Sequence, residues 1–323
     1  MILASAPMAA LTHAGLRLLI HQFADPDEYF TEMIHCPSLV CKGQFEDWYL
    51  HTAPAPEKLV WQLTSNDAEY AAKAVPIVLE KGGIGVDLNM GCCAPQIVQS
   101  GAGFAWMQKP LTETAHFVRT VRQAINEYEK TQGRAFRLSV KLRLGITENT
   151  AFLHSFVQML IDEGGELITL HPRTQKQKYS RPAKHEFTHR LAEEFPIPIY
   201  GNGDINSFQK LQRMQSSYPC AGWMIGRAMI QKPWIFAELR GEQFEKPIDL
   251  YQTALLFLEF LQQEQPKEFW KTRMQRFFAL YCDNFTFAHY CKTLLLNAED
   301  IPEAEKRLQH YFAEVPEDRF LRG

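Results

Sequence analysis

Short apolar runs that end in polar residues or glycine recur along the first 240 residues of the chain. The segments between most of these runs carry apolar residues at helical spacing, which predicts strands that alternate with helices. Strands joined by helices pair in parallel, and eight such units close into a (β/α)8 TIM barrel of the α/β class. An open doubly wound sheet is the alternative, but no Gly-x-Gly-x-x-Gly follows the first run. The eight predicted strands are Ile2–Pro7, Tyr29–Ile34, Leu59–Leu63, Ile84–Asn89, Arg137–Lys141, Leu167–His171, Ile197–Gly201 and Gly222–Gly226.

The helix predicted after the third run carries signals for both of its ends. Asn66 or Asp67 is suited to cap its first turn, and Gly82 follows its last apolar residues. Pro76 lies inside this pattern, and because proline lacks an N–H group it should kink or shorten the helix.

Composition changes after about Arg240, because residues 249–323 contain almost no glycine and are rich in Leu, Phe, Gln and Glu. We therefore expect a TIM-barrel domain over residues 1–240, followed by a small all-helical C-terminal domain over residues 241–323. The four helices predicted in this second part are Leu250–Gln263, Trp270–Cys282, Phe287–Leu296 and Ala304–Phe312.

Composition and charge narrow the functional classes only a little. The chain has 323 residues, 46% hydrophobic and 22% charged, as in ordinary globular proteins. A net charge of −3 is compatible with nucleic-acid binding only if basic residues are clustered. Seven cysteines without Cys-x-x-Cys, and without histidines at zinc spacing, predict no metal site. No signal peptide opens the chain and no apolar run approaches about 20 residues, so we expect a cytoplasmic location and no membrane span.

Polar residues and glycines follow the predicted strands at their carboxyl ends. In a barrel of this class the functional groups lie at these ends. A single polar residue there more often caps a loop. Solubility alone, however, does not explain why all eight predicted strands are followed by such candidate residues. The candidates, in chain order, are Pro7, Met8, His35, Gln62, Asn89, Cys92, Lys141, Arg143, His171, Asn202, Gly203, Asp204, Gly226 and Arg227.

The residues after the last two predicted strands suit a phosphate group. Gly203 and Gly226 allow the backbone to approach an anion, and Arg227 can pair with phosphate oxygens. Barrels often hold phosphate in these two loops. The whole set of candidates therefore suits flavin mononucleotide (FMN).

Lys141 has three interpretations. Beside a flavin it would place a cation at the N1/O2 edge of the ring, where reduction puts negative charge. A salt bridge inside the barrel mouth is the structural alternative, and a Schiff-base lysine is the chemical one. The Schiff base leaves the glycines and Cys92 unused. In the flavin interpretation, the ring's pyrimidine edge and an apolar shelf are supplied by His171, Gln62, Pro7 and Met8.

The run Asp87-x-Asn89-x-Gly91-Cys92 resembles the Asp-x-Asn-x-Gly-Cys-Pro signature of the tRNA-dihydrouridine synthases, with Cys93 in place of the proline. One such motif is weak, but seven in the family's order and spacing are specific. The other matching segments are Ala6-Pro7-Met8, Gln62, Val140-Lys141-x-Arg143-x-Gly145, His171-x-Arg173-Thr174, Gly201-Asn202-Gly203-Asp204 and Ile225-Gly226-Arg227.

The resemblance implies an FMN barrel followed by a helical tRNA-binding domain. It implies reduction of the C5=C6 bond of a D-loop uridine, with hydride from FMN to C6, a proton from Cys92 to C5, and NADPH as the reductant. His35, Asn89 and Arg143 would lie nearest the uracil. The residues implied to hold FMN are Pro7, Met8, Gln62, Lys141, His171, Asn202, Gly203, Asp204, Gly226 and Arg227.

A basic, aromatic stretch in the C-terminal part is the candidate RNA contact. Arg273 and Arg276 are three residues apart, so on a helix they share a face that could contact phosphates. The alternative is a solvated face of a helical bundle with aromatic residues in its core. The family resemblance favours RNA.

Two other functions remain open. One is a flavin barrel that oxidises or reduces a free dihydropyrimidine or dihydroorotate-like molecule, with the C-terminal helices as a dimer interface. The other is a non-catalytic RNA-binding protein, since Cys93 and Trp106 depart from the family pattern. We favour a monomeric tRNA uridine reductase. Spacing from Asn89 and Gly91 favours Cys92 as the acid, although the missing proline could loosen the loop and bring Cys93 into that place.

Overall fold

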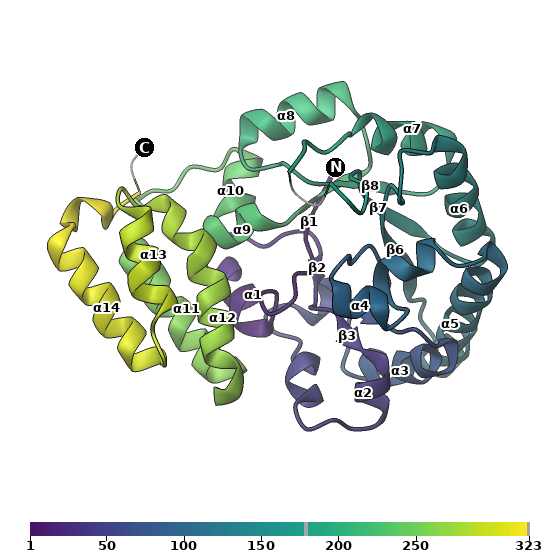
Figure 1. The fold of residues 1–323 in the computed structure, drawn as a ribbon, viewed down its shortest axis with the longest axis horizontal. Helices are drawn as coiled ribbons and strands as arrows, with labels where there is room; N and C mark the ends of the chain where they lie inside the picture. Colours follow the sequence, from purple (N-terminus) through teal and green to yellow (C-terminus); the bar gives the residue numbers. More distant parts are fainter. Residues whose placement is uncertain (178–179, 322–323) are drawn as a thin grey trace.

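Parallel strands form a nearly closed barrel in the computed structural model, which describes residues 1–177 and 180–321. The strand order is β1-β9-β8-β7-β6-β5-β4-β2, and β3 also pairs with β4. The (β/α)8 prediction is therefore confirmed (Figure 1). The strands are β1 (Ile2–Ser5), β2 (Tyr29–Phe30), β3 (Ile34–His35), β4 (Leu59–Thr64), β5 (Gly85–Met90), β6 (Arg137–Arg143), β7 (Leu167–His171), β8 (Ile199–Asn202) and β9 (Gly222–Ile225).

The second strand position of the barrel differs from the single predicted strand. It is divided into β2 and β3, which both run parallel to β4. At the break, Thr31 Oγ1 accepts a hydrogen bond from the Gln62 N–H (3.0 Å), so a side chain takes the place of a ladder carbonyl. A parallel bridge between Ala4 and Glu28 brings this second strand position next to β1 and nearly closes the barrel.

Helices surround the barrel and follow most of its strands (Figure 1). Asp67 caps α3 by accepting from the Tyr70 N–H (2.9 Å). The predicted shortening of this helix is wrong, because α3 continues through Pro76 to Glu80. Pro76 faces solvent, where water can satisfy the backbone carbonyl that the proline leaves unpaired. These helices are α1 (Ala14–His21), α2 (Cys36–Val40), α3 (Ala68–Glu80), α4 (Pro95–Gln99), α5 (Leu111–Gln132), α6 (Thr150–Asp162), α7 (Glu186–Glu194), α8 (Phe208–Ser217), α9 (Arg227–Gln231) and α10 (Ile235–Arg240).

A helical region follows the barrel, as predicted. It packs through stacked aromatic rings, among them Phe257 and Phe277 with ring centroids 3.6 Å apart. One helix of this region also lies tightly against α1, since a Cβ on Gly15 would meet the Phe260 carbonyl oxygen at 2.8 Å. The helices are α11 (Leu250–Glu264), α12 (Lys267–Tyr281), α13 (Ala288–Leu296) and α14 (Ile301–Glu314).

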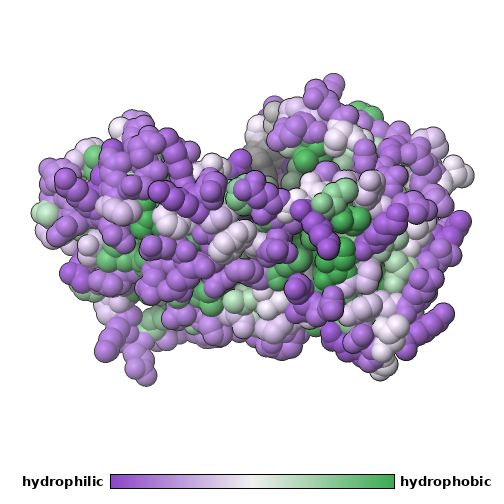
Figure 2. All heavy atoms as spheres, turned by 90° about the horizontal axis from the view of Figure 1, so that it is seen from below, coloured by the Kyte–Doolittle hydropathy of each residue, from purple (hydrophilic) through white to green (hydrophobic). Residues whose placement is uncertain are grey.

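The surface is largely hydrophilic and is hollowed between the barrel and the helical region (Figure 2). Beneath it, one continuous apolar core joins the barrel to the helical region. Across residues 1–177 and 180–321, no helix has the combination of length and apolar character that crossing a bilayer requires.

Candidate active site

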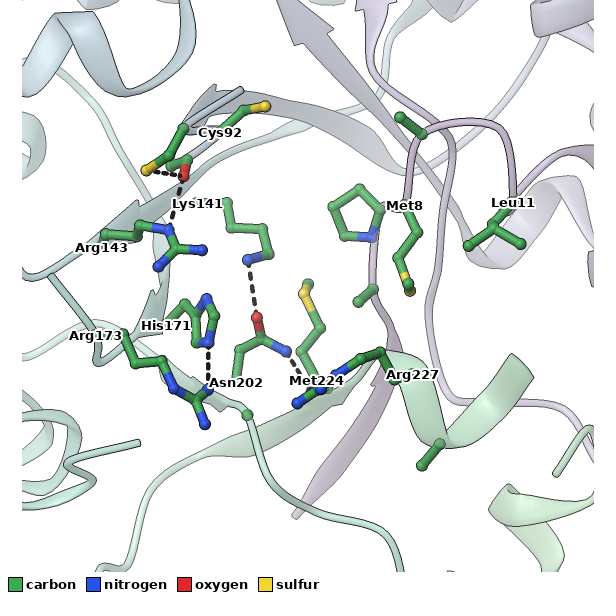
Figure 3. A pocket seen from close by; sticks show the side chains of 18 of the residues that line it. Met8, Leu11, Cys92, Lys141, Arg143, His171, Arg173, Asn202, Met224 and Arg227 are labelled. Carbon is green, nitrogen blue, oxygen red and sulfur yellow. Dashed lines mark hydrogen bonds between the residues drawn. The ribbon is translucent and has the colours of Figure 1, made fainter. Parts of the chain in front are cut away.

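A cavity of about 730 Å³ opens at the carboxyl ends of the barrel strands and extends to α12 (Figure 3). It is called the central cavity below. It brings together residues that lie far apart in the sequence, which is the expectation for the carboxyl ends of barrel strands. The predicted site residues that line it are Pro7, Met8, Asn89, Cys92, Lys141, Arg143, His171, Asn202, Gly203, Asp204, Gly226, Arg227 and Arg276.

Gln62 does not lie in the central cavity, although it was predicted to hydrogen-bond the flavin ring. Its side chain is fully buried between strands. The amide nitrogen donates to Asp87 Oδ2 (2.7 Å), and the amide oxygen accepts from Asn89 Nδ2 (2.8 Å). Each end of the amide therefore has one hydrogen-bond partner inside the barrel, and a contact of Gln62 with the flavin ring stays a prediction.

His35 also lies outside the cavity lining. It is exposed at the end of β3, with its Nδ1 2.7 Å from Ser38 Oγ. Its predicted place nearest the uracil stays a prediction.

Arg273 requires a correction, because it does not share an exposed face with Arg276. Its side chain is 2% exposed and its NH1 donates to the Glu32 carboxylate (2.8 Å), which is 5% exposed. The guanidinium also lies 5.0 Å from the centre of the Phe269 ring. Arg276 is exposed and lines the cavity. The three-residue spacing predicted proximity correctly, but Glu32 on the barrel draws one of the two arginines into the interior.

Lys141 projects from β6 across the barrel mouth (Figure 3). Its Nζ donates to Asn202 Oδ1 (2.9 Å), and Asn202 Nδ2 in turn donates to the Met224 carbonyl (2.8 Å). Burial, followed by the charge of Arg143, lowers the pKa of Lys141 to about 8. At neutral pH the cavity thus holds an ammonium group whose hydrogen-bond partner is neutral.

His171 is neutral in this environment. Burial and then the charges of Lys141 and Arg143 move its pKa far below the ordinary value. Its Nε2 lies 2.7 Å from Arg173 NH1. Because a guanidinium only donates, Nε2 accepts, and the proton of the neutral ring is on Nδ1.

Arg173 is a cavity residue that belongs to a family-like segment but received no role from the sequence. It is 2% exposed, and its NH2 donates to both carboxylate oxygens of Asp204 (2.6 and 2.7 Å). Its position two residues after His171 at a strand end was the available signal. The same arginine therefore orients an imidazole and neutralises a carboxylate.

Asp204 and Gly203 shape the loop after β8. Burial tends to raise the pKa of Asp204, but hydrogen bonds from Arg173 and the Ala183 N–H lower it overall. Gly203 has a φ of 125°, and a Cβ there would lie 3.1 Å from Arg173 NH1. Glycine thus allows the backbone to approach the guanidinium, while the Asp204 carboxylate holds it.

The Cys92 loop is held by hydrogen bonds at its start and by a proline at its end. Asn89 Oδ1 accepts from the N–H groups of Gly91 (3.2 Å) and Cys92 (2.9 Å). The Cys93 thiol donates to the Gly91 carbonyl (3.5 Å). Ala94, just before Pro95, is extended with φ −61° and ψ 131°. The loop is thus ordered by these contacts although Cys93 stands where the family has proline.

Trp106, the other departure from the family pattern, is a packing residue. Its ring stacks on Phe117 with centroids 4.2 Å apart, and its Nε1 donates to the Ser65 carbonyl (2.7 Å). It does not line the central cavity.

The charges around the cavity favour an anionic ligand. Guanidinium and ammonium groups come from barrel strands, from α9 and from α12, whereas Asp204 is engaged by Arg173. Asp283, which lines the cavity from the helical region, forms an ion pair with Lys292. Among the described residues, no cluster of three or more His, Cys, Asp or Glu side chains is arranged to hold a metal ion. The site can therefore bind an anion and present a thiol beside it.

Comparison with known proteins gives concordant results. Residues 3–315 match the family model described as "Dihydrouridine synthase (Dus)". The chain is 27% identical over 314 residues to the "Probable tRNA-dihydrouridine synthase" of Aquifex aeolicus, covering 94% of each chain. It is 24% identical to the "Probable tRNA-dihydrouridine synthase 1" of Synechocystis, covering 94% of this chain and 84% of the relative. Morphinone reductase has a similar fold, with a TM-score of 0.53 and 12% identity over 76% of this chain and 87% of that structure.

Proposed function

Because the chain belongs to the dihydrouridine synthase family, we propose that it reduces the C5=C6 bond of a uridine in tRNA to dihydrouridine. One observation carries the proposal at the level of this molecule. A thiol, a buried ammonium and a neutral imidazole face one cavity, which also receives an arginine from the helical region. Such a cavity suits a flavin on the barrel side and a nucleic acid on the helical side.

The groups around the cavity fit FMN. Backbone at Gly203 and Gly226 would lie along the phosphate, with Arg227 paired to its oxygens. Met8 stands across the cavity from Lys141 and offers an apolar wall for the ring (Figure 3). The full set that would hold FMN comprises Pro7, Met8, Lys141, His171, Asn202, Gly203, Asp204, Gly226 and Arg227, with Arg173 in addition.

Two of these residues would act through their neighbours. Asn202 would hold the Lys141 ammonium at the ring edge, and the Asp204 carboxylate would hold Arg173. His171 would donate from Nδ1 to a ring acceptor, because its Nε2 already accepts from Arg173.

When bound in its reduced form, FMN would supply the hydride that C6 of the uracil accepts, and NADPH would then reduce the flavin again. Negative charge then lies on C5 and O4 of the uracil. The Cys92 thiol would donate its proton to C5 and complete the addition, a role worth about 10²–10⁴ in rate for a general acid. Arg143, whose Nε donates to the Gly91 carbonyl (3.0 Å), would lie beside the base and hold the thiol loop.

A uridine stacked in folded tRNA cannot enter this cavity, so the base would be extruded from the stack. Arg276 on α12, which lines the cavity, would contact a phosphate near the extruded base. A D-loop target, a monomeric state and a cytoplasmic location remain predictions from the sequence.

The decisive experiment uses the purified protein and unmodified tRNA. We expect a yellow protein that releases FMN, not FAD, on heating, because the glycines and the arginine that follow β8 and β9 suit a terminal phosphate. The reduced enzyme should be reoxidised by unmodified tRNA in a single turnover. A colourless protein that does not take up FMN would contradict the proposal, and efficient turnover of free uracil or dihydroorotate would favour the small-molecule enzyme.

A further inference from the structure

A chain of hydrogen bonds runs inside the barrel wall beneath Cys92. Ser139 Oγ donates to Asp87 Oδ1 (2.7 Å), and Gln62 Nε2 donates to Asp87 Oδ2 (2.7 Å). Asn89 Nδ2 donates to Gln62 Oε1 (2.8 Å), and Asn89 Oδ1 accepts from the N–H groups of Gly91 and Cys92. Asp87, Gln62 and Ser139 are fully buried, so water does not compete for these contacts.

The direction of this chain is set at its buried end. An ionised carboxylate can only accept, so Gln62 must turn its NH2 group toward Asp87 and its oxygen toward Asn89. Asn89 must then turn its own NH2 group toward Gln62. This leaves the Asn89 oxygen for the two backbone N–H groups of the loop. If Asn89 were reversed, its NH2 group would face two other donors and all of these bonds would be lost.

We propose that Asp87 is a positioning residue, which acts through Gln62 and Asn89 to fix the loop that carries the Cys92 thiol. The proposal rests on the proposed role of Cys92 as the proton donor.

The charge state of Asp87 supports this arrangement. Burial raises its pKa to about 6, although the hydrogen bonds from Gln62 and Ser139 and the charges of Lys141 and Arg137 oppose the rise. The carboxylate is therefore ionised at neutral pH and remains an acceptor only.

Substitutions of the residues that form this hydrogen-bond chain test the direction of its hydrogen bonds. Gln62→Met interrupts it while preserving most of the side-chain volume, and Asp87→Leu removes its buried acceptor. Asp87→Asn is the conservative variant, because its oxygen can still face Gln62 if its NH2 group turns to Ser139 Oγ. That hydroxyl can then donate to the Val86 carbonyl, 3.5 Å away. Thr169→Val is the matched control, since the Thr169 hydroxyl is buried in the barrel and has no hydrogen-bond partner within the described part of the chain.

Two readouts separate positioning from general stability. Amide hydrogen exchange of Gly91 and Cys92 reports on the loop without any substrate. Single-turnover oxidation by tRNA of the enzyme that carries reduced FMN reports on the chemistry. Gln62→Met and Asp87→Leu should speed exchange at both amides and slow tRNA reduction by about 10²-fold, the usual effect of a small misplacement. Asp87→Asn and Thr169→Val should stay close to the parent in both readouts.

A second substitution provides a rescue. In the Gln62→Met background, Asn89→Asp supplies a carboxylate that accepts from both loop amides in either orientation. This variant should regain slow exchange at Gly91 and Cys92, because it no longer needs a partner to orient it.

The outcomes distinguish the two proposals. If the amides respond as expected but the parent protein does not reduce tRNA, the proposed function fails and the positioning role stands. If folded Gln62→Met keeps the parent's exchange and turnover, the positioning role is overturned. It is also overturned if Asp87→Asn is as damaging as Asp87→Leu, because the charge and not the direction of the hydrogen bonds would then matter. Should Asp87→Leu not fold, Gln62→Met and its rescue decide.

Discussion

The two adjacent thiols differ in what engages them. Cys93 donates back to the Gly91 carbonyl, the same oxygen that Arg143 Nε holds. Cys92 is the residue whose backbone N–H is fixed by Asn89, so its place in the cavity is set directly by the loop contacts. This asymmetry favours Cys92 as the proton donor.

We expect Cys92→Ala to slow tRNA reduction by about 10²–10⁴-fold, the usual contribution of a general acid. FMN binding and reduction of the flavin by NADPH should be unchanged, because the substitution removes no group from the proposed flavin site. Cys93→Ala, the matched control at the neighbouring position, should have a mild effect. Single-turnover oxidation by unmodified tRNA measures both variants, and the opposite ranking would reverse the assignment.

Lys141 should make flavin affinity depend on pH. Its pKa is lowered to about 8 by burial and by Arg143, so it is a cation below that pH and loses its proton as the pH rises through it. FMN affinity of the apoprotein should therefore fall across this range. The free energy of unfolding of the apoprotein should instead rise over the same range. The reason is that an unfolded lysine keeps its proton to about pH 10.4, whereas the folded Lys141 does not. Fluorescence titration and urea unfolding measure the two trends, and Lys141→Met should remove both.

At the scale of single elements, α12 joins the helical region to the barrel mouth. Arg273 pairs with Glu32, whose other carboxylate oxygen accepts from the Ala10 N–H in the loop that follows Pro7 and Met8. This buried pair seats the helix so that Arg276 reaches the central cavity. The two arginines of one helix thus serve different purposes.

Substituting the two arginines separately tests this division. Arg273→Ala leaves the buried Glu32 carboxylate without its ion-pair partner and should lower the free energy of unfolding by about 3–5 kcal/mol. Arg276→Ala should change stability by less than about 0.5 kcal/mol. It should weaken tRNA binding and reduce the salt dependence by roughly one unit of slope for one lost phosphate contact. Urea unfolding measures the effect on stability, and tRNA binding at several salt concentrations measures the salt slope. The assignment would be contradicted if both variants reduced the salt slope equally and neither changed stability.

The same arginines mark what the sequence allows one to predict. Most strands and helices followed from local periodicity, although the second predicted strand is divided in two and the helix around Pro76 is longer than expected. The strand-end residues that face the cavity followed from the barrel class, because its carboxyl ends always converge. The burial of Gln62 and Arg273 did not follow, since it depends on Asp87 and Glu32, partners that only the folded chain brings into contact. Arg173 received no role for a similar reason, because its partner Asp204 comes from the loop after β8.

At the scale of the whole molecule, the barrel and the helical region meet over a tight contact between α1 and α11. A Cβ on Gly15 would lie 2.8 Å from the Phe260 carbonyl oxygen, and this backbone atom cannot turn aside as a side chain could. A hydrogen bond between His51 Nδ1 and Glu264 Oε2 (2.7 Å) links the same two parts. The central cavity receives residues from both parts, so its shape depends on how they are seated.

Gly15→Ala should therefore separate the two proposed halves of the function. The added methyl group must push α11 outward, and overpacking of this kind costs about 1–3 kcal/mol of stability. Lys141 lies on β6 and Arg227 begins α9, and neither element takes part in this contact, so FMN affinity should stay at the parent value. Binding of tRNA should weaken, because Arg276 moves with the helical region. Gly43→Ala is the control, since a Cβ on that exposed glycine would meet the flexible Glu46 side chain, with its Cγ at 3.2 Å, and the Ser38 carbonyl oxygen only at 3.4 Å. FMN titration and tRNA binding on the same samples give the answer, and a parallel loss of both affinities in Gly15→Ala would show that the seating of α11 controls the whole barrel mouth rather than the RNA side alone.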